Sequence, residues 1–195
     1  MIDSALQDPV VPARWTAEQY LRLVDDGVLG PDDRVELLEG VIVSVAPQNV
    51  AHAAGVVRAN HCLTIAVGER AHVRPQLSFI AGKYSVPEPD LAVIAGGLDV
   101  SDRAHPRDAL LVVEVSDSSL KQDRLTKAPM YAAANLPEYW IVNLRDGCVE
   151  VRRDPDPKAR RYRRVTIARR GDVLEPIALE GVRIAVDDLL PSGIG

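Results

Sequence analysis

Cysteine is scarce in this sequence, with only Cys62 and Cys148 among 195 residues. Two isolated cysteines exclude a disulfide-stapled secreted scaffold, and they lack the spacing of a zinc site. Long hydrophobic runs are also missing, because no stretch of about 18 apolar residues occurs that could span a bilayer. The first residues lack the basic and apolar regions of an export signal. We therefore expect a cytoplasmic protein without a membrane segment.

Basic residues are outnumbered, with 23 Lys and Arg against 28 Asp and Glu and a net charge of −5. This balance counts against a general nucleic-acid binder, which needs positive charge to neutralise phosphates. The deficit is uneven, however, because residues 151–170 hold nine basic and two acidic side chains, a local charge of +7. This stretch is either a solvated hairpin face or a surface that contacts phosphates. The candidate phosphate contacts are Arg160, Arg161, Arg163 and Arg164.

Internal repeats, low-complexity tracts and a Pro/Gly-rich linker are missing as well. Hydrophobic residues make up 47% of the chain and charged residues 26%, which is typical of globular proteins and not of disordered or fibrous ones. A chain of 195 residues is long enough for one well-buried core. We expect a single domain over residues 15–195, preceded by a loose tail at residues 1–14.

Local patterns predict helices and strands in the first half of the chain. A capping-box pattern followed by helical periodicity indicates a helix over residues 17–26. β-Branched residues over 35–45, interrupted by Gly40, predict two short strands joined by a tight turn. Apolar residues then recur at helical spacing over 52–69, and alternation over 73–79 predicts a half-buried strand.

The second half contains two continuous apolar runs, at residues 91–95 and 110–115, which are typical of central strands with both faces covered. A third helix is expected to begin at Ser118 or Ser119, with Pro129 either kinking it or lying in its first turn. Further strands are expected at residues 138–144, 148–153 and 162–168, with a hairpin turn at 146–147. This order of elements predicts a mixed α/β or α+β sheet.

Two acids and a lysine stand beside these apolar runs. Asp90 ends the segment PEPD just before one central strand, where a carboxylate at the strand's edge can point into a cleft. Glu114 lies inside the run LLVVEV, where a buried acid is costly unless it is paired or binds a cation. Lys127 follows and can orient or deprotonate a water and stabilise charge on phosphorus. These are the minimum parts for holding Mg²⁺ against a phosphodiester.

Each of these residues also has an ordinary structural explanation. Asp90 can be a simple strand-entry residue, and Glu114 can face water at a sheet edge. Asp123 and Lys127 stand four residues apart in the favourable acid-then-base order, so they can pair on a helix surface. The chemical interpretation therefore depends on whether the fold brings Asp90 and Glu114 together.

With these residues identified, the chain resembles the Uma-type putative restriction endonucleases, a branch of the PD-(D/E)XK nuclease superfamily. The resemblance covers residues 15–190 and depends on a set of motifs, of which no single one is specific. They are RVELLEG at 34–40, His52, Gln76, PEPDLAV at 87–93, LLVVEVSDSSLKQDRLTK at 110–127, Tyr131 and NLPEYWIVN at 135–143.

The resemblance implies roles for individual residues. Asp90 matches the first metal-binding acid, and Glu114 matches the acid of the E-x-K element. The chain departs from the general superfamily pattern two residues later, because Ser116 stands where a lysine is expected. Lys127 matches the displaced lysine of this branch. Glu36 matches the acid of the family's ELxxG segment and is a further candidate metal ligand or a residue that supports one.

Three other residues match family positions with less defined roles. His52 is either a cap or core-edge residue or part of the site, and Gln76 is a candidate for orienting the lysine or a water. Asp123 is expected to order Lys127 and not to bind metal. Tyr131, Glu138 and Trp140 are interpreted as packing residues.

The resemblance implies a restriction-endonuclease-like fold, with a mixed sheet, flanking helices and added N- and C-terminal β-hairpins. It also implies Mg²⁺-dependent hydrolysis of phosphodiester bonds, with Mn²⁺ as a substitute, and a nucleic-acid partner, DNA more than RNA. A homodimer is expected by analogy. Two alternatives stay open, which are a catalytically silent module that binds nucleic acid or protein, and a metal-dependent hydrolase of non-nucleic phosphate esters.

Overall fold

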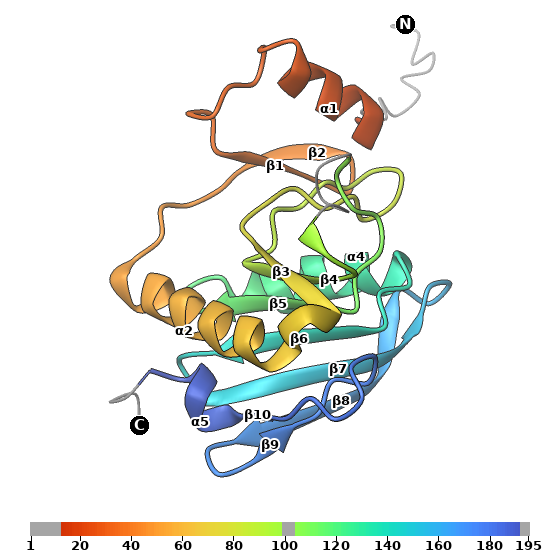
Figure 1. Cartoon of the computed structure of the whole chain (residues 1–195). Coiled ribbons are helices and arrows are strands. Elements are labelled where there is room, and N and C mark those ends of the chain that lie inside the picture. Colours follow the sequence, from red (N-terminus) through yellow and green to blue (C-terminus); the bar gives the residue numbers. More distant parts are fainter. Residues whose placement is uncertain (1–12, 99–103, 192–195) are drawn as a thin grey trace, which may run out of the picture.

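A six-stranded mixed sheet runs through the centre of the molecule (Figure 1). The computed structural model describes residues 13–98 and 104–191. Among the five neighbouring strand pairs of this sheet, only β5 and β6 are parallel, and this is the mixed α/β class that the sequence predicts. The strands in spatial order are β3 (Ala71–Pro75), β4 (Leu91–Ala95), β5 (Leu111–Ser116), β6 (Glu138–Asn143), β7 (Cys148–Asp156) and β8 (Arg161–Arg169).

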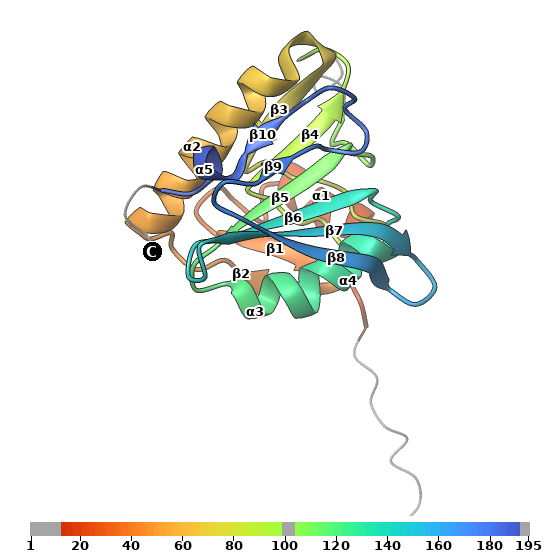
Figure 2. The same cartoon turned by 90° about the horizontal axis from the view of Figure 1, so that it is seen from below.

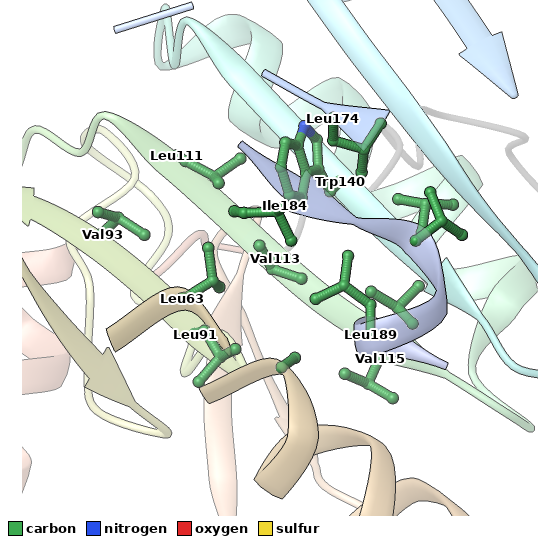
Figure 3. Close-up of a cluster of buried hydrophobic side chains, with 14 of the residues drawn as sticks. Leu63, Leu91, Val93, Leu111, Val113, Val115, Trp140, Leu174, Ile184 and Leu189 are labelled. Carbon is green, nitrogen blue, oxygen red and sulfur yellow. The ribbon is translucent and has the colours of Figure 1, made fainter. Parts of the chain in front are cut away.

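Helices cover both faces of the sheet (Figure 2). The long helix α2 (Val50–Val67) and the short α5 (Val186–Leu189) pack on one face, and α4 (Ala128–Ala133) packs on the other. Figure 3 shows the first of these two cores, in which Leu63 of α2 and Leu189 of α5 lie among the strand residues. Because both faces are covered, every residue of β5 and β6 is buried, which explains their continuous apolar sequences.

The N-terminal elements form as the sequence predicts. Helix α1 (Ala17–Asp25) begins at Thr16 with the expected capping box. Strands β1 (Val35–Leu38) and β2 (Val41–Ser44) form an antiparallel hairpin. The turn between them includes Gly40 at a φ of 83°, a left-handed conformation that glycine adopts at low cost.

The predicted strand over residues 73–79 is wrong beyond Pro75, where β3 ends. The next residue, Gln76, has a φ of 50°, and its N–H donates to the Asp90 carbonyl at 3.1 Å instead of continuing the strand. Phe79 is nevertheless buried, but from a loop. Leu77, in contrast, is 48% exposed, so the alternating pattern predicted the burial of Phe79 correctly but not that of Leu77, and it predicted the conformation of neither.

The third helix is interrupted in its middle. It consists of α3 (Leu120–Gln122), a π-helical turn η3 (Asp123–Lys127) and α4. Pro129 lies in the first turn of α4, directly after the π turn, which is one of the two positions that the sequence allows. Ser119 is the N-cap residue, although its side chain makes no capping hydrogen bond.

The C-terminal region adds elements to the predicted strand list. The hairpin of β7 and β8 is longer than expected, and a small second sheet forms from β9 (Val173–Leu174) and β10 (Ile184–Ala185). A 3₁₀ turn, η1 (Gly68–Arg70), follows α2. Residues 1–12 of the expected tail lie outside the described residues. In the part of the chain that is described, no helix has both the length and the apolar character needed to cross a bilayer.

Candidate active site

Asp90 and Glu114 lie side by side. Strands β4 and β5 are antiparallel, with Leu91 opposite Val113, so the residues just beyond this pair meet at the same end of the two strands. The backbone N–H of Val115 donates to Asp90 Oδ2 at 2.8 Å, and the N–H of Asp90 approaches Glu114 Oε2 at 3.4 Å. The separation of 24 residues in sequence is thus closed by strand pairing, which the chemical interpretation requires.

Lys127 completes the central group. Its Nζ donates to Glu114 Oε1 at 2.8 Å, and it lies 3.7 Å from Glu36 Oε1. Burial raises the pKa of Glu114 well above its ordinary value, while the charge of Lys127 opposes that rise. Burial would lower the pKa of Lys127, but the charges of Glu114, Glu36 and Asp123 outweigh burial and raise it. The surrounding carboxylates therefore favour the charged ammonium form of Lys127.

Glu36 adds a third carboxylate from the N-terminal hairpin. It is only 4% exposed, and its Oε1 accepts a hydrogen bond from the Glu88 N–H at 3.2 Å. Burial is the largest cause of a raised pKa at Glu36, and Lys127 and the Glu88 N–H oppose it. β1 is paired with β2 and is not a strand of the central sheet, so its position over the site is a product of tertiary packing.

His52 and Gln76 both contact one oxygen of Asp90. His52 Nε2 lies 3.1 Å from Asp90 Oδ1, and Gln76 Nε2 donates to the same oxygen at 3.5 Å. The pKa of His52 is raised, chiefly by this hydrogen bond, against the opposing effect of burial. His52 reaches the site from the first turn of α2, which Asn49 caps. The helix start and the left-handed turn at Gln76 thus aim two polar groups at one carboxylate.

Asp123 is held by serines. Its Oδ2 accepts hydrogen bonds from Ser116 at 2.5 Å and from Ser119 at 2.7 Å. Burial raises the pKa of Asp123, although Lys127 and the two serines oppose the rise. Ser116, at the position where the superfamily pattern has a lysine, therefore anchors the helix that carries Lys127. The surface pair between Asp123 and Lys127 that helical spacing allows is not the arrangement found, since both side chains are buried.

Two residues of the site were not singled out as functional by sequence reasoning. Tyr131, expected to serve packing alone, donates its hydroxyl hydrogen bond to Glu114 Oε1 at 3.1 Å. Its position four residues after Lys127 is the signal that could have indicated this. Glu88, the first acid of PEPD, lines the same cleft, with its Oε1 accepting from Ser78 at 3.2 Å.

The acids of the site, with His52, Gln76 and Lys127, line a polar cleft of about 490 Å³, while Tyr131 lies buried beneath it. The charged groups of its lining are Arg34, Glu36, Glu88, Asp90, Glu114, Asp123 and Lys127, so acids outnumber cations apart from histidine. Asp90 and Glu114 are 7% and 3% exposed, and a substrate must therefore reach to the floor of the cleft.

The donor set suits a hard divalent cation that keeps much of its own water. Mg²⁺ is bound in proteins by one or two carboxylates plus water and phosphate oxygens, and Asp90 with Glu114 supplies two. Within residues 13–98 and 104–191 no three His, Cys, Asp or Glu side chains are arranged as a complete metal site. The residues fit Mg²⁺ as ligands of a partly hydrated ion and do not form an all-protein cage.

The four candidate phosphate-binding arginines lie on the β7–β8 hairpin. Arg160 pairs with Glu39 at 2.8 Å, Arg163 with Asp156 at 3.0 Å and Arg164 with Asp154 at 3.0 Å; Arg161 begins β8.

Strand register places these arginines away from the central acids. Arg164 pairs with Arg153, which pairs with Glu138 of β6, whereas Glu114 pairs with Ile141, three residues further along the same strand. Three residues of strand correspond to roughly 10 Å. A role for the hairpin in binding nucleic acid stays a prediction.

The family model that matches this chain is described as "Uma2: Putative restriction endonuclease", and it covers residues 17–187. The chain belongs to the Uma2 family. The resemblance inferred from the sequence motifs is thereby confirmed, and with it the nuclease class of the family. The family match does not say which substrate the protein acts on or whether it needs a metal ion.

The fold of this Uma2 protein is similar to that of a solved structure. It is the crystal structure of a protein from Anabaena variabilis ATCC 29413, described as a putative nuclease belonging to DUF820. The two share 16% sequence identity with a TM-score of 0.70, and the likeness covers 91% of this chain and 97% of the other. No curated protein matches the chain. At this identity the likeness shows the restriction-endonuclease-like fold.

Proposed function

We propose that this Uma2 protein is a Mg²⁺-dependent endonuclease that hydrolyses phosphodiester bonds of nucleic acid. The observation that carries the proposal is the contact of Asp90 with Glu114 across paired strands, with Lys127 bound to the same glutamate. Family membership supports the nuclease class. The site geometry supports metal-assisted hydrolysis within that class.

Asp90 and Glu114, together with the backbone carbonyl of Val115, would hold the metal. Mg²⁺ bound there would supply Lewis-acid activation of a phosphate oxygen and of the attacking water. Asp90 Oδ2 is fixed by the Val115 N–H, so the strand itself orients the carboxylate. His52 and Gln76 restrain its other oxygen at 3.1 Å and 3.5 Å, and Glu36 is a candidate for a second ion at the cleft wall.

Lys127 acts as a cation in this proposal. Because its pKa is raised, it keeps its proton, and it would orient the attacking water and stabilise the negative charge that develops on the phosphoryl group. The other role expected for Lys127, deprotonation of the water, is less favoured because a protonated amine cannot accept a proton. The ammonium lies 2.8 Å from Glu114 Oε1 and is therefore next to the proposed metal ligands.

The proposed substrate is DNA in preference to RNA, and a homodimer is the proposed assembly by analogy with enzymes that cut two strands. The arginines of the β7–β8 hairpin would contact the phosphate backbone. Such contacts position a nucleic acid without selecting sequence. The excess of acids in the cleft implies that divalent cations must be present before the polyanion can approach closely.

The direct test replaces Asp90 or Glu114 with Ala and measures cleavage of plasmid DNA in Mg²⁺. Each variant is expected to lose cutting while circular dichroism remains that of the parent protein. Glu180→Ala, an exposed acid outside the cleft lining, is the matched control and should cut as the parent does. Equal cleavage by parent and by Asp90→Ala would remove Asp90 from the mechanism.

Calorimetric titration with Mg²⁺ and Mn²⁺ separates this proposal from a silent binding module. Burying three acids and one lysine costs folding free energy, and a site that binds metal accounts for that cost where a silent binding module does not. Metal binding that requires Glu114 is expected. Nucleic-acid binding without any dependence on Glu114 or on divalent metal would instead favour the module. Comparing plasmid, RNA and small phosphodiesters as substrates tests the non-nucleic alternative.

A further inference from the structure

The two oxygens of Glu114 have different surroundings. Oε1 accepts hydrogen bonds from Lys127 Nζ at 2.8 Å and from the Tyr131 hydroxyl at 3.1 Å. Oε2 faces Asp90, whose N–H approaches it at 3.4 Å, a long and weak contact. Oε1 thus accepts two side-chain hydrogen bonds, one of them from a cation, while Oε2, beside Asp90, keeps the capacity to bind a metal ion.

The π turn brings Asp123 onto the same side of the helical segment as Lys127 and Tyr131. The sequence places Asp123, Lys127 and Tyr131 at intervals of four residues. In an uninterrupted α-helix, each interval of four residues rotates the side-chain direction by about 40°, which gives about 80° over the two intervals. The π turn is closed by the hydrogen bond from the Ala128 N–H to the Asp123 carbonyl. Its wider turn rotates the chain less per residue and cancels part of that drift. All three side chains consequently face the sheet on the Glu114 side.

The Tyr131 ring is fixed in place. It is 0% exposed, and its centroid lies 5.0 Å from that of Tyr139 and 6.4 Å from that of Phe79. Burial, followed by the charge of Glu114, raises its pKa well above the ordinary value. The packed ring therefore keeps the hydroxyl oxygen within 3.1 Å of Glu114 Oε1, to which it donates.

We propose that Tyr131 is a positioning residue for metal binding, which acts by holding Glu114 Oε1 so that Oε2 faces Asp90 and the cation. Lys127 supplies charge to the same oxygen but has a flexible stem, whereas the tyrosine supplies direction from a rigid ring. Without the hydroxyl, the carboxylate can rotate toward Lys127 and offer its second oxygen less often. The inference rests on the proposed metal-dependent function and adds a role that packing alone does not require.

The test compares Tyr131→Phe with Tyr162→Phe. Both variants remove one buried hydroxyl from the same aromatic group, but the Tyr162 hydroxyl donates to the Leu136 carbonyl at 3.0 Å and not to Glu114. Tyr139→Phe is a second control, because its hydroxyl lies 3.4 Å from the Asp123 carbonyl. The primary readout is Mg²⁺ affinity by calorimetry, and thermal unfolding without metal serves as the measure of folding.

Tyr131→Phe is expected to weaken Mg²⁺ binding by about ten-fold to a hundred-fold, the range found for residues that orient metal ligands. Both controls should bind Mg²⁺ within about two-fold of the parent. The half-saturating Mg²⁺ concentration for cleavage should rise in parallel. Saturating Mn²⁺ should restore cutting by Tyr131→Phe, because the variant retains Lys127 and both acids.

Two results would overturn the inference. One is a Tyr131→Phe protein that folds and binds Mg²⁺ as tightly as Tyr162→Phe. The other is a loss of cutting that saturating Mn²⁺ does not restore, which would indicate a structural defect. If the parent protein binds Mg²⁺ and cuts nucleic acid, and Tyr131→Phe binds Mg²⁺ and cuts equally well, only the inference about Tyr131 fails. If the parent protein binds no divalent metal, the proposed function fails with it.

Discussion

Lys127 Nζ lies 2.8 Å from Glu114 Oε1, in an ion pair whose members are thirteen residues apart and both almost fully buried. Glu114 comes from the centre of a sheet strand and Lys127 from the π turn of the next helical segment. Removing one member of a buried pair leaves an uncompensated charge in the interior. The pair therefore links the stability of the fold to the chemistry proposed for the cleft.

Lys127→Met should lower the cleavage rate by at least about 100-fold, because it removes a cation from the developing charge. It should also destabilise the protein, more at alkaline than at acidic pH, since Glu114 can then relieve its isolation only by taking up a proton. Cleavage rates and urea unfolding measure the two effects. Lys121→Met changes an exposed lysine of the same helical segment and should alter neither. A Lys127→Met enzyme with normal activity would contradict the assigned role.

The metal-free protein should lose thermal stability as pH rises from about 5 to about 8. Burial raises the pKa of Glu36 and Glu114 above 4.5, so their contribution to stability is complete below that value and is lost as pH rises through their folded pKa. His52, raised above 6.5 by its hydrogen bond to Asp90, acts in the same direction at higher pH. Glu150 has a lowered pKa and acts in the opposite direction, only below 4.5.

Differential scanning calorimetry across this pH range is the measurement. Glu114→Gln keeps a hydrogen-bond acceptor for Lys127 and Tyr131 but cannot titrate, so it should flatten the dependence. Mg²⁺ should recover stability at the alkaline end, since a ligand of the folded state stabilises it. Stability that increases with pH in the metal-free parent would show that these carboxyls are not the dominant groups.

Gly55→Ala should disturb the site through its backbone. A Cβ at this position of α2 would lie 2.7 Å from Val115 Cγ1, next to Glu114 on β5. Alanine gains about 1 kcal/mol over glycine in a helix, but overpacking a core costs about 1–3 kcal/mol. We expect a net loss of up to about 2 kcal/mol from these two terms.

The same shift of α2 should move His52 relative to Asp90 and reduce Mg²⁺ affinity. Chemical denaturation and metal titration measure both outcomes. Ala54→Ser, at the exposed neighbouring position, is the control and should change neither. A Gly55→Ala protein that is more stable than the parent would show that the helix and strand are less closely packed than the structure indicates.

Replacing the hairpin arginines with Ser should weaken DNA binding by a similar factor for all sequences and should reduce its salt dependence. Each lost phosphate contact lowers the slope of log affinity against log salt by about 1. The residues to change are Arg160, Arg161, Arg163 and Arg164. Arg22→Ser on α1, where the arginine pairs with Glu18, is the control. An unchanged salt slope would show that the hairpin arginines are solvated and do not contact nucleic acid.

Much of the fold follows from local patterns. The continuous apolar runs became β4 and β5, and the capping box at Thr16 became the start of α1. Predictions failed or stopped short where long-range contacts decide the conformation. After Pro75 the chain forms a loop that buries Phe79 but leaves Leu77 exposed, and the π turn could not be distinguished from an α-helix by spacing.

The sequence by itself identified the residues that we propose to carry the chemistry, because an acid inside an apolar strand is costly to bury unless it is paired or binds a cation. It also determined the family, through motifs spread over most of the chain. Only the tertiary structure decided what these residues touch. The pairing of β4 with β5 joins Asp90 to Glu114, the hairpin brings Glu36 within 3.7 Å of Lys127, and the packing of α4 on the sheet brings the Tyr131 hydroxyl to Glu114. Such contacts depend on distances between segments that no local pattern encodes, so they emerge only when the whole core is packed.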